Sequence, residues 1–327
     1  MDNIDLIKNK IKDKKHILLS LDLDDTFVNR SIGDNYVSDD NLKTVKIILE
    51  KKNITVIINT GRERYGYESF CIANKIDTRN AILGSGSVIE VEGVFSFDEN
   101  AAIEKDLVVA IYNLIENQHI PFADVAYFYD RCIVHGFNES AKLFFSQNPT
   151  SWFDAYPKLL RFDESMDLSQ VFRIELPLPQ DKYTKLCNKL DDKKKNWFSS
   201  FQEILPTGVL LQKEYFLKRK SDFKGILEDK IKFCRIEVDE TKVNKGTGLK
   251  LWIQKSGLKC EDFVVIHIGD KDSGIVNDTI IKSEIPQSLI LMVGDDFEKS
   301  NPLVDTYFDG DVDLGVGQIL NLLQEAQ

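Results

Sequence analysis

The sequence predicts an α/β fold in which a doubly wound parallel sheet is interrupted by an inserted α+β domain. Near both ends of the chain, apolar strand-like runs alternate with amphipathic helices, which is the βαβ pattern of such a sheet. Between them, strands outnumber helices without strict alternation, which is typical of an antiparallel sheet. The 327 residues suffice for two domains. We therefore expect a core built from residues 1–86 and 233–327, with residues 87–232 inserted as the second domain.

The first core segment opens with isoleucines at helical spacing in residues 3–14, which predict a short amphipathic helix. Residues 16–21 are an apolar run between charged residues, as expected of a buried strand. The next expected elements are a helix over 42–52 and strands over 54–59 and 81–83. The sequence GSGS at residues 84–87 follows, and we interpret it as a hinge where the chain leaves the core.

The inserted segment shows a helical pattern at 103–115 and an aromatic strand at 122–129. The remaining expected elements are a strand around 172–176, a helix at 183–190, and strands near 196–204 and 208–217. The last core segment then predicts a helix ending at Gly257, a buried strand at 263–268, short strands within 288–308 and a helix at 316–323.

Three acids, Asp22, Asp24 and Asp25, directly follow the first strand. Open α/β sheets bind ligands at the carboxyl ends of their strands. If the extended backbone continues through Leu23, Asp22 and Asp24 project to the same side. Two neighbouring carboxylates repel each other, and a divalent cation is the usual way to hold both ionised. The alternative is that these acids only end the strand and begin a turn.

Thr60, Gly61 and Arg62 follow the second strand at the same edge. A hydroxyl donor, a glycine that lets backbone N–H groups approach closely and an arginine suit a phosphate. The alternative is an ordinary strand-to-helix turn. Lys245 lies at the start of a later helix, where a lysine and the helix amino terminus favour negative charge. A lysine in a loop is common, and the order of Lys245 after the inserted segment makes it our choice over Lys242 and Lys250.

Asp270 follows the buried strand 263–268 and starts the segment GDKDSGIVND. A second Gly-Asp-Asp occurs at 294–296, which we interpret as a late edge strand and loop. His267 lies inside the buried strand, and we interpret it as a core histidine and not as a base.

These segments together resemble a known family. Residues 22–27 (DLDDTF) resemble the DxDx[TV]-hydrophobic signature of the haloacid dehalogenase (HAD) superfamily, which consists mostly of phosphohydrolases. Residues 60–62 (TGR) resemble the sugar-phosphatase branch known as Cof-type, with the sucrose- and mannosylglycerate-phosphate phosphatases nearby. Lys245-Gly246 and the segment 269–278 resemble the third and fourth motifs. At the position of Asp25 many members carry Gly, and GSGS only partly matches the Asn-Gly pair of the Cof-type branch.

The resemblance implies a HAD-like core with an αββ cap domain that closes over the active site and selects the substrate. It implies that Asp22 attacks phosphorus to form an aspartyl-phosphate and that Asp24 acts first as an acid and then as a base. Because Asp24 must be protonated when the ester oxygen leaves, we expect its pKa above the free value of about 3.9.

For the ligands, the resemblance implies Mg²⁺ as the cofactor, bound by Asp22, Asp24 and Asp270. The residues expected to bind the phosphate are Thr60, Gly61, Arg62 and Lys245. The candidates to complete the metal site are Asp272, Asn277 and Asp278, and the lengthened fourth motif leaves this choice open.

We thus predict a magnesium-dependent phosphohydrolase that removes phosphate from a small phosphorylated metabolite, with a sugar phosphate as the expected class. The alternatives are a phosphosugar mutase or phosphotransferase, which would return the phosphoryl group to a sugar, and a non-catalytic binding protein on the same fold.

Composition bounds the partners and the compartment. The net charge of -11 and the pI near 5.0 argue against nucleic acid as the main partner. The five cysteines are widely spaced without a CxxC pattern, which favours a reducing compartment. No secretory signal is evident at the start and no apolar run is long enough to cross a membrane, so we expect a cytoplasmic protein without a membrane partner. The oligomeric state does not follow from the sequence.

Overall fold

The computed structural model describes part of the chain. The described residues are 3–12, 14–109, 112, 123–128, 130–134, 159–160, 166–179, 231–238, 242–259, 261–270, 278–294, 301–309 and 312–325. The chain divides into two compact units, one made of 1–98 with 241–327 and the other of 99–240. Each unit is described by itself.

The described residues cover most of the first unit and a smaller part of the second.

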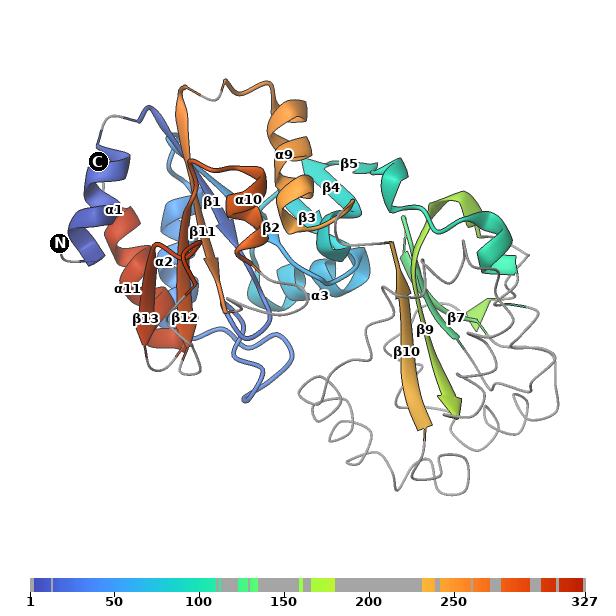
Figure 1. The fold of residues 1–327 in the computed structure, drawn as a ribbon. Coiled ribbons are helices and arrows are strands. Elements are labelled where there is room, and N and C mark those ends of the chain that lie inside the picture. Colours follow the sequence, from blue (N-terminus) through green and yellow to red (C-terminus); the bar gives the residue numbers. More distant parts are fainter. Residues whose placement is uncertain are drawn as a thin grey trace. The chain divides into compact units, whose positions relative to one another are not determined.

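The first unit contains an eight-stranded sheet in the order β13-β12-β11-β1-β2-β3-β4-β5 (Figure 1). Its strands are β1 (His16–Leu21), β2 (Ile54–Asn59), β3 (Ala81–Leu83), β4 (Val88–Val91), β5 (Val94–Phe97), β11 (Phe263–Gly269), β12 (Leu289–Gly294) and β13 (Thr306–Asp309). The strands from β13 to β3 are parallel, and β4 and β5 add to the β3 edge as antiparallel strands. This mostly parallel α/β sheet confirms the predicted fold class.

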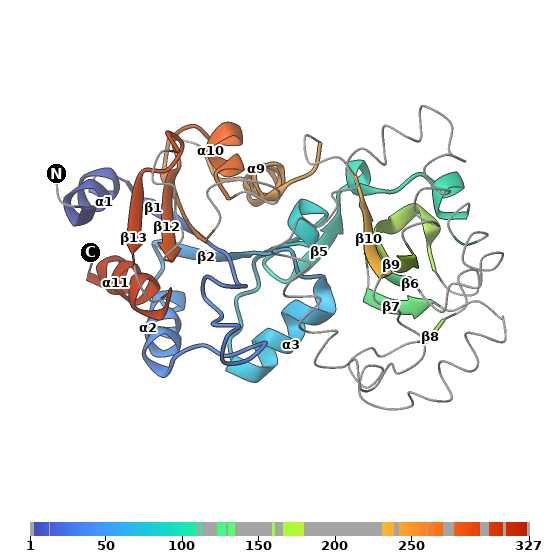
Figure 2. The same cartoon turned by 60° about the horizontal axis from the view of Figure 1, so that its bottom comes forward.

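Helices cover both faces of this sheet, as Figure 2 shows, with α9 and α10 on one face and α2, α3 and α11 on the other. The helices are α1 (Asn3–Ile11), α2 (Asp39–Leu49), α3 (Arg64–Asn74), α9 (Lys245–Ser256), α10 (Ile280–Glu284) and α11 (Val312–Glu325). On the α9 face, Leu249 and Trp252 pack into the core with apolar residues of the sheet. Gly257 ends α9 in the left-handed conformation with φ 73°, as predicted.

Strand β1 lies at the point where the order of connection reverses. From β1 the chain proceeds through β2 to β3 on one side, and from β11 through β12 to β13 on the other. The carboxyl ends of β1, β2 and β11 therefore meet at one edge, where sheets of this kind bind ligands. The side chains of β11 are buried along its whole length, and those of β1 and β2 nearly so.

The chain leaves the core later than expected. The predicted boundary at residue 87 is wrong because β4 pairs with β3, with Ile89 opposite Ile82, so the hairpin of β4 and β5 belongs to the core sheet. The GSGS segment is not a hinge but a packed 3₁₀ turn, η1 (Gly84–Gly86). At Gly86, φ is +111° and a Cβ would lie 2.3 Å from the Asn244 carbonyl oxygen, so glycine is required.

The second unit contains a five-stranded sheet in the order β10-β9-β6-β7-β8. Its strands are β6 (Ala123–Tyr127), β7 (Asp130–Val134), β8 (Leu159–Leu160), β9 (Val171–Pro179) and β10 (Ile231–Glu237). All pairs are antiparallel except that of β7 with β8. The predicted return to the core at residue 233 is also too early, because β10 pairs with β9 as far as Glu237.

The helix expected at 183–190 and the strands expected near 196–204 and 208–217 lie outside the described residues. Within the part of the chain that is described, no helix is both long and apolar enough to span a membrane.

Candidate active site

Three neighbouring strands deliver polar side chains to the same edge of the core sheet. Asp22 follows β1, Thr60 follows β2 and Asp270 follows β11. Lys245, the first residue of α9, reaches the same place, because its Nζ lies 2.9 Å from Asp22 Oδ2. The motifs that are far apart in the sequence thus lie together at one edge of the core sheet.

Lys245 joins two buried carboxylates. Its Nζ lies 2.6 Å from Asp278 Oδ1 in addition to its contact with Asp22, and all three side chains are less than a tenth exposed. Burial raises the pKa of Asp22, and the Lys245 ammonium opposes this effect. Burial also acts on Asp278, but there the Lys245 ammonium prevails and holds the pKa of Asp278 well below its usual range. One lysine thus contacts both buried acids and offsets part of their negative charge.

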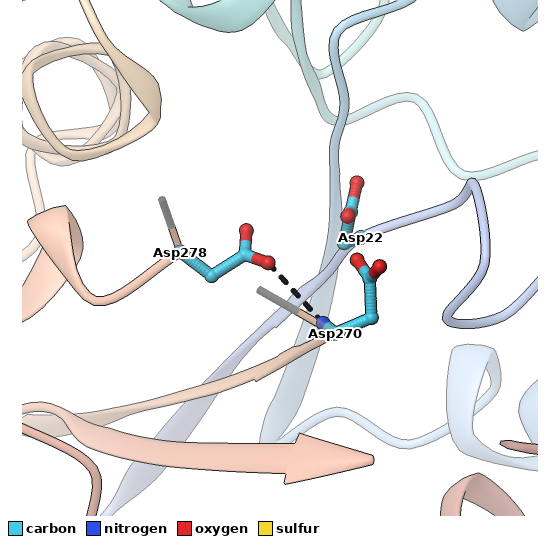
Figure 3. Close-up of side chains that lie close together, drawn as sticks. All are labelled: Asp22, Asp270 and Asp278. Atoms are coloured by element: carbon cyan, nitrogen blue, oxygen red, sulfur yellow. Dashed lines mark hydrogen bonds between the residues drawn. The ribbon is translucent and has the colours of Figure 1, made fainter. Parts of the chain in front are cut away.

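Asp22, Asp270 and Asp278 form a group that could hold a metal ion, since one oxygen of each lies within 4.8 Å of the others (Figure 3). The backbone N–H of Asp270 donates to Asp278 Oδ2 at 3.2 Å. This approach needs glycine at position 269, because a Cβ there would lie 2.4 Å from Asp278 Oδ2. Three carboxylates are hard oxygen donors, so the residues present fit Mg²⁺.

Among the candidates to complete this group, Asp278 is the one that the structure brings to the other acids. Asp272 and Asn277 lie outside the described residues, as do Asp295 and Asp296 of the second Gly-Asp-Asp. Thr26 adds a contact that the sequence analysis did not foresee, because its hydroxyl donates to Asp270 Oδ1 at 3.2 Å.

The start of α9 explains how Lys245 is positioned. Asn244 caps the helix, and its Oδ1 accepts from the N–H groups of Gly246 at 2.8 Å and Thr247 at 2.9 Å. These two N–H groups are therefore bound by the cap and do not face a ligand. Of the favourable interaction with negative charge that we expected from the helix amino terminus, the contribution of the helix dipole remains. Of the other lysines considered, Lys242 is exposed and Lys250 pairs with Glu284 at 3.3 Å.

Asp24 does not join the three acids of the metal group. The extended backbone stops at β1, and the N–H of Val28 donates to the Leu23 carbonyl at 2.7 Å in a turn. Asp25 in this turn has φ 62°, a left-handed conformation that glycine adopts freely and aspartate tolerates. This explains why glycine and aspartate both suit the position. The prediction that Asp24 binds the metal stays a prediction.

The carboxylate of Asp24 pairs with Arg62. The Arg62 Nη2 lies 2.6 Å from Asp24 Oδ1, and its Nε lies 3.1 Å from both carboxylate oxygens. Burial raises the pKa of Asp24, but the Arg62 hydrogen bonds outweigh it and lower this pKa below its ordinary value. This direction is opposite to the one expected for an acid that must carry a proton. The expectation was wrong because it did not include Arg62 as a partner of Asp24.

The remaining predicted phosphate ligands lie on the loop after β2. Thr60 is buried, and its Oγ1 accepts from the Arg62 N–H at 3.2 Å. A Cβ at Gly61 would lie 3.4 Å from Ser85 Oγ, which is ordinary contact. Arg62 also donates to Asn35 Oδ1 at 2.6 Å. Its guanidinium thus connects Asp24 to the loop that follows the first motif, and phosphate binding by these residues stays a prediction.

Replacing Arg62 by methionine tests the contact with Asp24. We expect the metal-free variant to lose about 1–3 kcal/mol of unfolding free energy near neutral pH. The pKa of Asp24 is depressed in the folded state, so this stability is present above the ordinary value of 3.8 and is lost as the pH falls through the folded-state value. Urea unfolding should therefore show a difference that shrinks as the pH is lowered toward about 3.

The matched control is Arg79→Met, whose partner Asp77 forms an exposed pair with it, at 69% and 72% side-chain exposure. This control should change stability little. The assigned pair would be contradicted if the loss of unfolding free energy in Arg62→Met were the same near neutral pH and at the low pH. A loss no larger than in the control would also contradict it.

A second set of buried polar residues lies beneath the site and was not predicted as part of it. It consists of Ser20, Asn59 and His267, each fully buried, in β1, β2 and β11. The sequence signal was a polar residue near the carboxyl end of an otherwise apolar strand. The interpretation of His267 as a buried histidine agrees with the structure, although its ring also lies 3.2 Å from Asp278.

An open, mostly parallel sheet with acids, a lysine and a threonine at its topological switch point, interrupted along the chain by a second unit with a mainly antiparallel sheet, is typical of the HAD-like hydrolases. The chain belongs to this family: the model of haloacid dehalogenase-like hydrolases matches residues 19–275. No curated protein matches the chain.

Solved structures share the fold over nearly the whole chain. A protein of Geobacillus kaustophilus HTA426 has a TM-score of 0.63 at 13% identity, covering 94% of this chain and 99% of that chain. A Plasmodium vivax structure described as a HAD/COF-like hydrolase has a TM-score of 0.57 at 15% identity, covering 97% and 99%. A protein of Bacteroides thetaiotaomicron, described among the phosphatases of the HAD superfamily, has a TM-score of 0.56 at 14% identity, covering 94% and 95%.

Proposed function

We propose that the protein is a magnesium-dependent phosphohydrolase that acts on a small phosphorylated metabolite, with a sugar phosphate as the expected substrate class. The observation that carries this proposal is the buried carboxylate of Asp22, which contacts Lys245 and lies in one group with Asp270 and Asp278. Family membership supports the hydrolase chemistry. The acidic composition supports a small substrate over nucleic acid, and the cysteine usage supports a cytoplasmic location.

In the proposed reaction, an oxygen of Asp22 forms a bond to phosphorus while the ester P–O bond breaks. Asp24 gives its proton to the leaving oxygen and then takes a proton from a water molecule. The oxygen of this water bonds to phosphorus, the bond to Asp22 breaks, and inorganic phosphate leaves. Lys245 and Thr60 would stabilise the charge on the phosphoryl oxygens.

Asp24 must bind a proton before the ester oxygen leaves, whereas its contact with Arg62 favours the ionised form. We propose that Arg62 exchanges Asp24 for the incoming phosphate, which would relieve this conflict. Magnesium, held by Asp22, Asp270 and Asp278, would supply neutralisation of charge and alignment of the phosphoryl group.

The test measures release of inorganic phosphate from an aryl phosphate and a panel of sugar phosphates, with magnesium or with EDTA. We expect turnover that EDTA abolishes and that magnesium restores, because the acids of the site repel each other without a cation. No release from any compound, with folding intact, would overturn the proposal for those substrates. Transfer of phosphate between positions of one sugar, dependent on a bisphosphate activator, would instead indicate a mutase.

A further inference from the structure

Three buried polar side chains form a continuous chain across adjacent strands beneath the candidate active site. Asn59 Nδ2 lies 3.2 Å from Ser20 Oγ, and Ser20 Oγ lies 2.9 Å from His267 Nδ1. Ser20 and His267 are direct partners in the pairing of β1 with β11. Burying polar groups in an otherwise apolar sheet costs free energy unless they are hydrogen-bonded. Each of these three side chains therefore needs its neighbour as a hydrogen-bonding partner.

Asn59 is the donor in its two hydrogen bonds. Asn59 Nδ2 also lies 3.2 Å from the carbonyl oxygen of Lys245, which can only accept, so the amide nitrogen and not the amide oxygen occupies this position. The same nitrogen then donates to Ser20 Oγ. Ser20 Oγ is also hydrogen-bonded to His267 Nδ1, and because a hydroxyl can donate once and accept twice, this bond holds the ring whichever of the two atoms donates.

The Nε2 atom of His267 faces Asp278. The Nε2 atom lies 3.2 Å from Asp278 Oδ1, although the N–H is not well aligned, so the contact is a close electrostatic one and not an ideal hydrogen bond. The same Oδ1 contacts Lys245 Nζ at 2.6 Å, and Oδ2 accepts from the Asp270 N–H. Asp278 thus links Lys245 to the backbone of Asp270, and its orientation matters for both.

We propose that His267 is a positioning residue that is held by Ser20 through Nδ1, faces Asp278 through Nε2, and so orients Asp278 and, through it, the Lys245 ammonium. Asn59 donates to the backbone carbonyl of Lys245, and Asp278 contacts its Nζ. The three linked side chains thus hold both the backbone and the charged end of this lysine. The inference rests on the proposed function only in its kinetic consequence.

The first test is nitrogen-15 NMR of the protein with labelled histidine, in which His267→Gln assigns the signal among the four histidines. We expect a proton on Nε2 in the wild type, because this atom faces a carboxylate oxygen of Asp278. Ser20→Ala should shift the Nδ1 signal, because the hydrogen-bonding partner of this atom is removed. A ring that carries a proton on Nδ1 and none on Nε2 would overturn the inference, and this result does not depend on any turnover.

The second test compares His267→Leu with His267→Gln, because the glutamine side chain retains an N–H donor. We expect Leu to lower kcat by about 10–100-fold with a smaller effect on KM, and Gln to restore part of it. His16→Gln, at the opposite end of the buried strands, is the control. Equal kcat in the Leu and Gln variants would overturn the positioning role. If the Leu variant does not fold, Ser20→Ala and the NMR result decide the question.

Discussion

Replacing Asp22 by asparagine is expected to lower turnover by about 10⁴–10⁶-fold, the range seen when central catalytic residues are removed from a well-studied hydrolase. An amide is a far weaker nucleophile than a carboxylate, and the change also removes a negative charge from the metal group. The measurement is steady-state phosphate release with saturating magnesium. Circular dichroism should show that the variant keeps its fold.

Asp77→Asn is the matched control, because Asp77 is exposed and pairs only at the surface with Arg79. It should retain wild-type turnover. Quenching the reaction with acid in the presence of labelled substrate traps the phosphorylated protein and separates the role of Asp22 as nucleophile from its role as metal ligand. The wild type should become labelled and Asp22→Asn should not. Turnover in Asp22→Asn that recovers when the magnesium concentration is raised would show that Asp22 is only a metal ligand.

The central strands of the core could be predicted from the sequence with accurate bounds. Strands β1, β2 and β3 begin and end where expected, because strands buried on both faces appear as apolar runs bounded by polar residues. Helix α3 was not predicted. Gly66 directly precedes its buried residue Tyr67, and two polar residues separate Tyr67 from the next buried residue, Phe70, so its apolar face is narrow.

The boundaries of the inserted unit could not be obtained in the same way. The hairpin of β4 and β5 has the alternation of any antiparallel strand pair, and only its pairing with β3 assigns it to the core. The same holds for β10, which is assigned by its pairing with β9. Pairing between distant segments is a property of the folded chain and leaves no local mark in the sequence.

The residues of the candidate site likewise divide into those that the sequence predicts and those that it does not. Asp22, Lys245 and Asp270 could be predicted because each directly follows a strand or begins a helix at a known edge. Asp278 could not be chosen, since the length of the loop before it obscured its distance from the metal group. The pairing of Asp24 with Arg62 was also missed, because it depends on the turn that follows β1.

Replacing Lys245 by methionine should destabilise the metal-free protein by about 3–5 kcal/mol near neutral pH, because it leaves buried carboxylates without their cation. The pKa of Asp278 is depressed in the wild type. The ionised Asp278 therefore stabilises the folded wild type above the ordinary value of 3.8, and this contribution is lost as the pH falls below it. Without the lysine, burial raises the pKa values of the acids, and the variant should gain stability as the pH is lowered from neutral. The difference from the wild type should therefore shrink.

Urea unfolding with EDTA and with magnesium measures this effect. Magnesium should stabilise Lys245→Met more than the wild type, because the cation replaces the lost positive charge among Asp22, Asp270 and Asp278. Lys250→Met, in the same helix, is the matched control, since Lys250 is 55% exposed and its pair with Glu284 should contribute little. If both variants were equally stable in EDTA, the buried lysine would not hold the acidic group together, and the electrostatic account of the site would be wrong.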